Sequence, residues 1–215
     1  MILPLFLISH NFDQNGIFAK SYKDNIFTIH VSGSSKQNIN NTMQVTKPEY
    51  AIEPRDKRYD WCPNCFYNYE GLPYMILSMK SMKFRFNGYF IRVGCCFEDG
   101  CCCNDVYGCF DSCLYSWALQ ISNDNKTWKD VHTVSKNNDM RKCTEKTYQL
   151  DAEYTAKFVR IIQTETCPGL PLCMALNRIE LFGDTVPFSD DSNDEFASYH
   201  DDDNDVSIIG HISKR

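Results

Sequence analysis

The cysteines are the residues of this chain best equipped for chemistry, and they number 12 among 215 residues. Seven crowd into one stretch of 19 residues: Cys95, Cys96, Cys101, Cys102, Cys103, Cys109 and Cys113. The other five are Cys62 and Cys65 in a Trp-Cys-Pro-Asn-Cys segment, the isolated Cys143, and Cys167 and Cys173 before the last strand signal. Cysteine sulfurs form disulfides, bind metals as thiolates or remain free thiols, and each state suits a different compartment.

Three hypotheses for these cysteines stay open on sequence grounds. An even count allows complete pairing, although the connectivity cannot be read and adjacent cysteines do not pair easily with each other. Alternatively, Cys62 and Cys65 have the spacing of half a zinc site, which Cys101 and Cys103 would complete. Free thiols are the third hypothesis. Paired cysteines predict an extracellular protein, whereas reduced cysteines predict a cytoplasmic one.

Catalysis finds little support in the sequence. The segment Trp61 to Cys65 is similar to a thioredoxin-type redox motif, but strand and turn signals follow it where that chemistry needs a helix. The five histidines form no Ser-His-Asp or His-Glu-x-x-His arrangement, and no glycine-rich phosphate loop occurs. The sequence therefore predicts no enzyme and no cofactor other than a zinc ion.

Short strands are the elements that must position the cysteines. Period-two or continuous apolar patterns occur at residues 26–33, 74–79, 84–93, 117–122, 158–163 and 178–183. Asn87-Gly88 predicts a turn or bulge, and residues 122–125 predict a turn. No long segment has helical periodicity. About eight antiparallel strands with turns between them predict an all-β sandwich of the jelly-roll type with long loops at one end.

Side-chain alternation indicates which residues face the core. One face of the 84–93 strand is expected to carry Phe84, Phe86 and Phe90. We expect core positions for three further aromatic residues: Trp117, Trp128 and Phe158. Arg160 interrupts an apolar strand and is expected to form an ion pair or to clamp the backbone.

Charge divides the chain into a neutral body and an acidic end. Residues 186–215 hold eight acidic and two basic side chains, which account for the whole net charge of -6. A neutral body disfavours nucleic-acid binding, and no run is long enough for a transmembrane helix. We predict a short apolar segment at 1–11, one domain at 12–184 with a cysteine-rich loop at 94–116, and a disordered acidic tail at 185–215.

The order of motifs resembles the discoidin domain, also called the coagulation factor V/VIII type C domain, which has a galactose-binding-like fold. The resemblance is carried by SWALQISNDNKTW, FVRIIQTE and RIELFG in the second half of the chain. More loosely, NGIFAKSY and FTIHVSGSS resemble the family's opening strands, and Asp60-Trp61 falls where the family has a Trp on an exposed loop.

The resemblance implies a binding module whose protruding loops at one end bind carbohydrate, phospholipid headgroups or a protein. The ligand-binding candidates on these loops are Trp61, Asn64, Phe66, Tyr67, Tyr69, Phe97, Asp99, Tyr107 and Phe110. Aromatic faces suit the apolar face of a sugar ring, and polar neighbours fix its orientation. The Arg and His that sugar-binding members place before the Trp strand are missing here, because cysteines occupy that stretch.

We therefore predict a non-catalytic binding or adhesion module for carbohydrate or phospholipid headgroups. The alternative is an intracellular protein-interaction domain whose cysteine loop is reduced or binds zinc.

Overall fold

The chain folds into three antiparallel sheets in the computed structural model, which describes residues 16–65, 71–95, 102–104, 108–110 and 113–188. The largest sheet has the order β1 (Phe27–Val31), β4 (Tyr74–Met79), β11 (Phe158–Glu165), β8 (Ser116–Ser122) and β9 (Lys129–Val134). A second sheet has the order β10 (Glu145–Ala156), β5 (Met82–Val93) and β12 (Leu176–Pro187). The third, smaller sheet has the order β3 (Thr42–Val45), β2 (Lys36–Ile39), β6 (Cys102–Asn104) and β7 (Gly108–Phe110). The helical elements are α1 (Ile17–Ser21), η2 (Tyr22–Asp24) and η3 (Pro48–Ile52).

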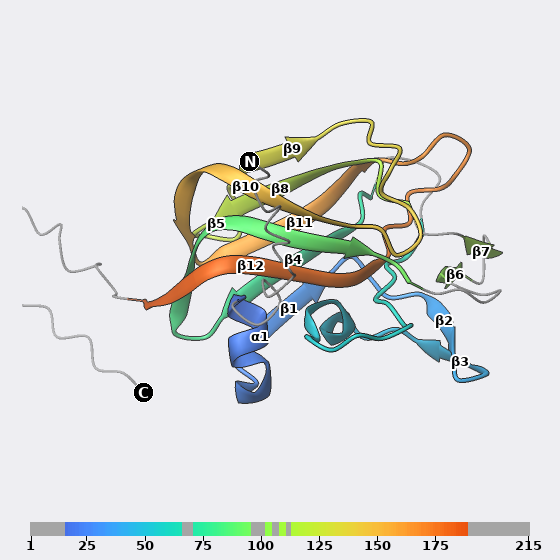
Figure 1. Cartoon of the computed structure of the whole chain (residues 1–215), viewed down its shortest axis with the longest axis horizontal. Helices are drawn as coiled ribbons and strands as arrows, with labels where there is room; N and C mark the ends of the chain where they lie inside the picture. Colours follow the sequence, from blue (N-terminus) through green and yellow to red (C-terminus); the bar gives the residue numbers. More distant parts are fainter. Residues whose placement is uncertain (1–15, 66–70, 96–101, 105–107, 111–112, 189–215) are drawn as a thin grey trace, which may run out of the picture.

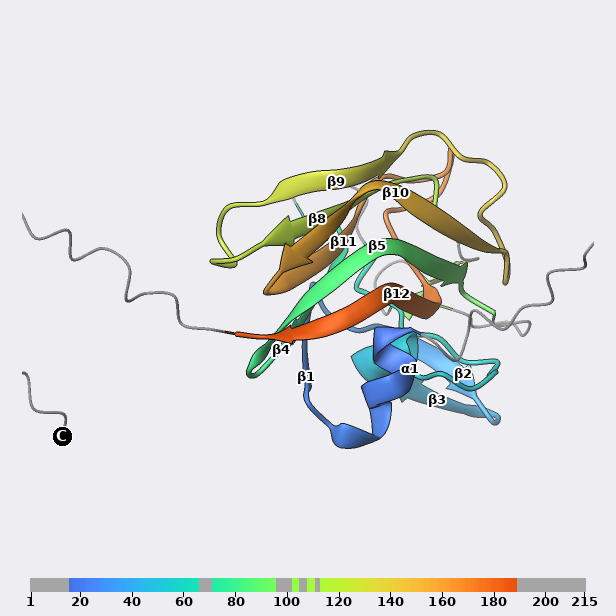
Figure 2. The same cartoon turned by 60° about the vertical axis from the view of Figure 1, so that its left-hand side comes forward.

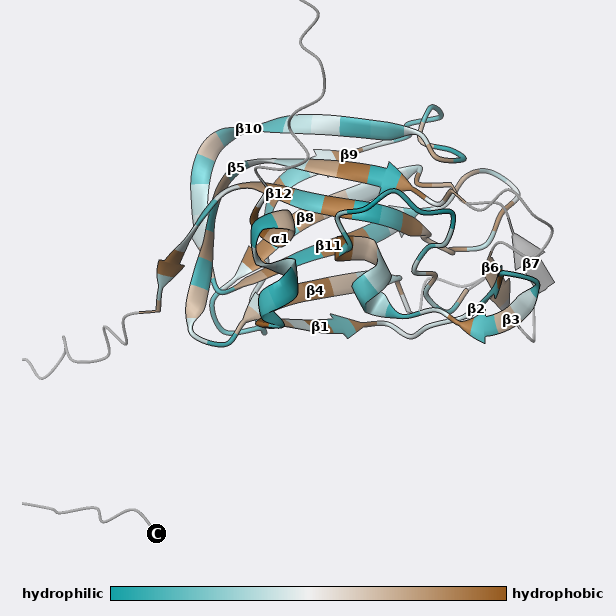
Figure 3. Cartoon of the chain, turned by 60° about the horizontal axis from the view of Figure 1, so that its bottom comes forward, coloured by the Kyte–Doolittle hydropathy of each residue, from teal (hydrophilic) through white to brown (hydrophobic). Residues whose placement is uncertain are grey.

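The five-stranded and three-stranded sheets pack face to face around one core, which confirms the predicted all-β sandwich (Figure 1). One layer contributes the fully buried Trp117, Leu119 and Val159, and the other contributes Ile91 and Ile179. Alternation along each strand sends these side chains inward. Figure 3 shows the complementary pattern on β10, an edge strand in largely hydrophilic colours whose residues are mostly exposed.

The predicted irregularity at Asn87-Gly88 is a β-bulge in the middle of β5. Both neighbouring strands break register there, since β10 shifts between Gln149 and Tyr154 and β12 shifts between Phe182 and Gly183. Gly183 has a φ of 153°, and a Cβ at this position would lie 2.0 Å from the carbonyl oxygen of Arg85. The backbone of β12 can therefore approach the bulge only with glycine here.

The bulge corrects one predicted face. Phe84 and Phe86 are buried in the core, but the extra residue reverses the alternation, so that Tyr89 and Ile91 point inward. Phe90 consequently lies on the opposite face of the sheet, where the Arg92 and Arg178 guanidinium groups stand 5.8 and 5.7 Å from its ring centroid.

The opening segment is also corrected, because residues 17–21 form a helix and not the predicted strand. Ile17 and Phe18 are buried in the core. The buried carboxylate of Glu180 accepts hydrogen bonds from the backbone N–H groups of Phe18 at 2.7 Å and Ala19 at 3.0 Å. These two donors belong to the first turn, where a helix has no internal acceptors. Glu180 therefore fixes the start of α1 against β12.

The small sheet and the end of β12 lie at opposite ends of the sandwich, as Figures 1 and 2 both show. We call the end that carries β2, β3, β6 and β7 the loop end. No helix among the described residues is long and apolar enough to cross a membrane.

Glu180 predicts a pH dependence of stability. Burial raises the pKa of this carboxyl from 4.5 to about 7. The folded chain therefore holds the proton more tightly than the unfolded chain, so this group stabilises the fold below about pH 4.5, and the contribution is lost as the pH rises through about 7. We expect wild type to lose about 3 kcal/mol relative to Glu180→Gln between about pH 4 and pH 8. Urea unfolding of both proteins across this range measures the difference. A constant difference would contradict the assignment, because other titrating groups cancel between the two proteins.

Candidate functional site

Disulfides hold the loop end together by joining segments that are distant in the sequence. The structure pairs Cys62 with Cys102, Cys65 with Cys173, Cys95 with Cys143 and Cys113 with Cys167. These bonds close sequence separations of 40 to 108 residues. Cys62, Cys65, Cys102 and Cys173 also pack with Ala175 into a small buried cluster outside the main core. Covalent bonds thus reinforce the small buried cluster at this end of the sandwich.

The pairing corrects the zinc hypothesis. Cys62 and Cys65 have different partners, and Cys103 is disulfide-bonded as well, so none of the three supplies a free thiolate. Cys101, the fourth proposed ligand, lies outside the described residues. Within the described ranges no group of His, Cys, Asp or Glu side chains could hold a metal ion.

A buried carboxylate organises the same region by hydrogen bonding. Asp60 is almost inaccessible to solvent, and its Oδ1 accepts hydrogen bonds from the backbone N–H of Cys95 at 2.8 Å and from Asn177 Nδ2 at 3.0 Å. Its Oδ2 accepts one from Gln37 Nε2 at 2.9 Å, and the Asp60 N–H donates to Gln37 Oε1 at 2.8 Å. Asp60 therefore connects β2, the start of the cysteine-rich loop and β12 at one point.

Trp61 corrects a predicted ligand contact. Its side chain is 0% exposed, and its backbone pairs with Leu176 through N–H···O bonds of 3.0 and 2.9 Å. The indole Nε1 donates to Ser34 Oγ at 3.2 Å. With both ring faces in the core, Trp61 cannot stack on a ligand and instead supports the loops from below.

The other ligand-binding candidates divide into two groups. Asn64 is exposed at the loop end, beside Gly33, where a Cβ would meet the Asn64 amide. Phe110 is the last residue of β7. The remaining candidates lie outside the described residues: Phe66, Tyr67, Tyr69, Phe97, Asp99 and Tyr107.

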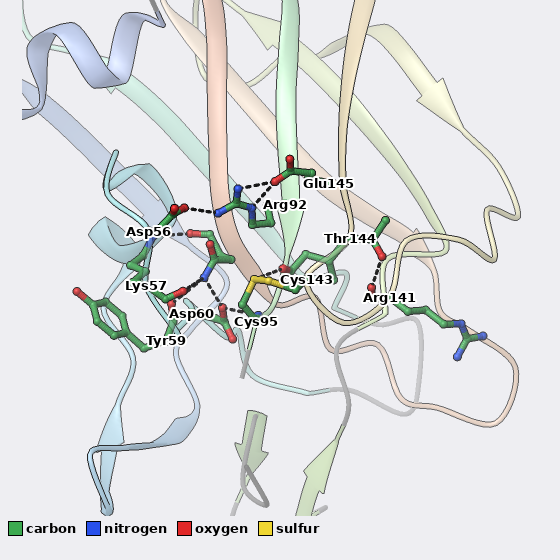
Figure 4. Close-up of a disulfide and its surroundings, with 12 residues drawn as sticks. Asp56, Lys57, Tyr59, Asp60, Arg92, Cys95, Arg141, Cys143, Thr144 and Glu145 are labelled. Atoms are coloured by element: carbon green, nitrogen blue, oxygen red, sulfur yellow. Dashed lines mark hydrogen bonds and ion pairs between the residues drawn. A yellow bond between two sulfur atoms is a disulfide. The ribbon is translucent and has the colours of Figure 1, made fainter. Parts of the chain in front are cut away.

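A charged depression of about 440 Å³ lies where the loop end meets the three-stranded sheet (Figure 4). Arg92 is its central residue and donates to Asp56 Oδ1 at 2.8 Å and to Glu145 Oε2 at 2.6 Å. The Cys95–Cys143 disulfide lies beside it, and Lys57 and Arg58 complete the lining.

The charges in this depression are tuned by their surroundings. The hydrogen bond and charge of Arg92 lower the pKa of Asp56, which keeps that carboxylate ionised. Lys57 donates to the Asn177 carbonyl oxygen at 2.7 Å, and burial lowers the pKa of its amine to about 8. The depression thus offers fixed cationic donors beside anionic acceptors, a set that suits hydroxyl groups.

The sequence reasoning did not single out this group. A charged triplet, Asp56-Lys57-Arg58, directly before Asp60-Trp61 was the available signal. The sequence does not show that this triplet lies beside Arg92 and Glu145, because Asp56 and Arg92 are 36 positions apart and Arg92 and Glu145 are 53 positions apart.

Two predicted core aromatics lie nearer the surface than expected. Trp117 is fully buried, but Trp128 and Phe158 are only partly buried. The Arg160 guanidinium stands 4.0 Å from the Trp128 ring centroid, and its Nε donates to Gln120 Oε1 at 2.6 Å. Among the described residues, Arg160 therefore contacts an indole and an amide, and not the predicted ion-pair partner or backbone group.

Comparison with known proteins defines the fold. No protein-family model and no curated protein sequence matches the chain. Among solved structures, it is similar to CpGH89CBM32-5 from Clostridium perfringens, solved in complex with GalNAc-β-1,3-galactose, with a TM-score of 0.50 and 13% identity over 73% of this chain and 95% of that one. It is also similar to CBM32-1 from a family 31 glycoside hydrolase of Clostridium perfringens, with a TM-score of 0.50 and 10% identity over 73% and 94% of the two chains. The sandwich therefore has the galactose-binding-like fold of these carbohydrate-binding modules.

The disulfides predict the thiol count of the native protein. Nine described cysteines are disulfide-bonded, and Cys103 requires one further cysteine as its partner. We expect intact mass after denaturing alkylation to show at most two modified cysteines without reduction and all 12 after reduction. More than two without reduction would contradict the pairing.

Asp60 predicts a stability effect. In Asp60→Ala the buried Cys95 N–H and the Gln37 and Asn177 amides lose an acceptor, so we expect the free energy of unfolding to fall by about 3 kcal/mol. Asp56→Ala is the matched control: its side chain is 87% exposed, and we expect a loss below about 1 kcal/mol. Chemical unfolding of both oxidised variants gives these values. A loss in Asp60→Ala as small as the one expected for Asp56→Ala would show that the Asp60 network is dispensable.

Proposed function

We propose that this chain is a non-catalytic carbohydrate-binding module that binds glycans through its loop end. The observation that carries the proposal is the fold, a five-stranded sheet packed on a three-stranded sheet, together with the extra disulfide-tied sheet at one end. A module of similar fold binds GalNAc-β-1,3-galactose, so glycans that contain galactose or GalNAc are the first ligands to test. The proposed module includes the whole of β12 and so extends to Pro187.

The charged depression supplies the polar part of such a site. A pyranose presents hydroxyl groups that both donate and accept hydrogen bonds. Arg92 offers N–H donors held in place by two carboxylates, and Asp56 and Glu145 offer acceptors. Because these groups are already fixed by one another, a sugar would bind without ordering long side chains.

Aromatic residues of the neighbouring loops supply the apolar part of the proposed site. Phe66, Tyr67, Tyr69, Phe97, Tyr107 and Phe110, together with the polar Asn64 and Asp99, remain our candidates for contacts to the ring face and its hydroxyls. The positions of two neighbouring cysteines support this choice, because Cys65 and Cys102 flank these segments and are bonded to Cys173 and Cys62 at the loop end.

We infer that the protein works outside the cytosol. Its disulfides need an oxidising compartment to form and persist. A reduced or zinc-bound cysteine loop, on which the intracellular alternative depends, does not agree with this pairing.

A phospholipid surface is the second candidate ligand, favoured by one observation. Met43 and Val45 on edge strand β3 are 49% and 58% exposed at the loop end, where apolar side chains could enter a membrane interface. Binding to vesicles that Met43→Ser/Val45→Ser abolishes, with no signal on glycans, would favour this candidate over the first.

The carbohydrate proposal predicts an asymmetry between two arginines of the same strand. Arg92 and Arg85 both lie on β5 and both pair with two carboxylates, but Arg85 lies at the far end with Glu153 and Asp184. We expect Arg92→Ala to weaken glycan binding about tenfold or more, and Arg85→Ala to leave it unchanged. A glycan array identifies the ligand, and calorimetry gives the affinities. Equal effects of the two substitutions, or no glycan bound by the oxidised protein, would refute the proposal.

A further inference from the structure

The chain leaves the sandwich between two lysines. Pro187 pairs with Met82 at the last position of β12, and the Phe188 N–H donates to the Ser81 carbonyl oxygen at 3.0 Å. Phe188 is 37% exposed. Its centroid lies 5.0 Å from Lys83 Nζ and 4.7 Å from Lys157 Nζ, so the two ammonium groups bracket the exit point.

Neighbouring turns extend this positive surface. Lys80 lies in the turn between β4 and β5, Lys126 in the turn between β8 and β9, and Lys157 in the turn between β10 and β11. The Lys157 N–H donates to Asn123 Oδ1 at 3.1 Å, which ties the second turn to the third. We call Lys80, Lys83, Lys126 and Lys157 the lysine end; Figures 1 and 2 place the exit of β12 at the end of the sandwich opposite β2 and β3.

Carboxylates near the lysine end are already engaged elsewhere. Asp184 pairs with Lys20 at 3.6 Å and with Arg85 at 3.8 Å. Asp124 accepts hydrogen bonds from the backbone N–H groups of Lys126 and Thr127, both at 2.8 Å, within its own turn. Across the described part of the chain, no ion pair is formed by the four ammonium groups of the lysine end.

The sequence directly after β12 is acidic and could pair with these lysines. Residues 189–205 contain eight acidic side chains and no Lys or Arg, and the first two are Asp190 and Asp191. Seventeen residues span at most about 55–60 Å when extended, so every lysine of this end is within reach. We propose that the acidic segment 189–205 binds the lysine end of its own sandwich.

Tethering makes this contact effective although each exposed pair is weak. A short flexible link gives the second partner an effective concentration in the millimolar range, which favours contact within one molecule. The same contact neutralises a positive surface that would otherwise attract polyanions, and it leaves the loop end uncovered. The attraction is electrostatic, so salt weakens it: the Debye length falls from about 10 Å at 0.1 M to about 3 Å at 1 M.

Zero-length carbodiimide cross-linking of the full oxidised chain tests the proposal, because it joins only carboxylates and amines in contact. We expect cross-links from residues 190–205 to the lysine end within single chains, and none to Lys36 or Lys146, which lie on β2 and β10. Their yield should fall about threefold or more between about 0.02 M and 1 M salt. Equal yields on all lysines, or no salt dependence, would overturn the proposal.

A matched pair of variants separates binding from mere tethering. Lys83→Arg/Lys157→Arg keeps both charges, whereas Lys83→Gln/Lys157→Gln removes them, and neither variant can cross-link at these positions. The yield on Lys80 and Lys126 should therefore stay at the wild-type value in the first variant and fall about threefold in the second. Equal yields in the two variants would overturn the proposal. Thermal unfolding of both checks that the sandwich is intact, and the salt titration of wild type is an independent test that needs no substitution.

Discussion

The buried carboxylate of Asp60 is the interaction on which the loop end depends. It connects Gln37, the Cys95 backbone and Asn177, which lie 23, 35 and 117 positions away in the chain. Burying a carboxylate costs little free energy only when hydrogen-bond donors surround its oxygens. Those donors are themselves buried, so no water could accept their hydrogen bonds if the carboxylate were removed. The disulfides join the same segments: Cys62 lies two residues after Asp60 in the sequence, and Cys95 is the residue whose N–H donates to Asp60. The described segments of the loop end are therefore held by a polar centre and by covalent bonds, whereas apolar burial holds the sandwich.

Most of the sandwich could be predicted because apolar and polar residues alternate along a half-buried strand, which shows which side chains face the core. The alternation of Trp117 with Leu119, and of Ile179 with Leu181, matches the observed core. The Asn87-Gly88 signal located the bulge but not its consequence, because the reversal of the Tyr89 to Val93 faces depends on how β10 and β12 pair with β5. Helix α1 was missed for a related reason: five residues carry almost no periodicity, and its start is fixed by Glu180, 162 positions from Phe18.

The candidate site was less predictable than the fold. Clustered cysteines correctly pointed to the cysteine-rich segments as the unusual part of the molecule, but sequence alone left disulfides, zinc and free thiols open. Spacing in Cys62-x2-Cys65 suggested a shared ligand, whereas the fold sends the two sulfurs to Cys102 and Cys173. Trp61 was placed on an exposed loop by resemblance, but its pairing with Leu176 buries it. The depression around Arg92 has only a weak local signal, because its members come from three separate segments.

The two ends of the sandwich differ in whether their charged side chains have fixed partners, although the same sheets form both ends. At the loop end, β5 and β10 place Arg92 and Glu145 beside a disulfide, so these two charges are held in fixed positions. At the far end, β5 and the β10–β11 turn place Lys83 and Lys157 around Phe188, and neither lysine has a fixed carboxylate partner among the described residues. A fixed charge pair favours selective recognition, because binding needs no reorganisation. A lysine cluster without such pairs favours whatever anion is most concentrated nearby, and the tether makes the chain's own acidic segment that anion.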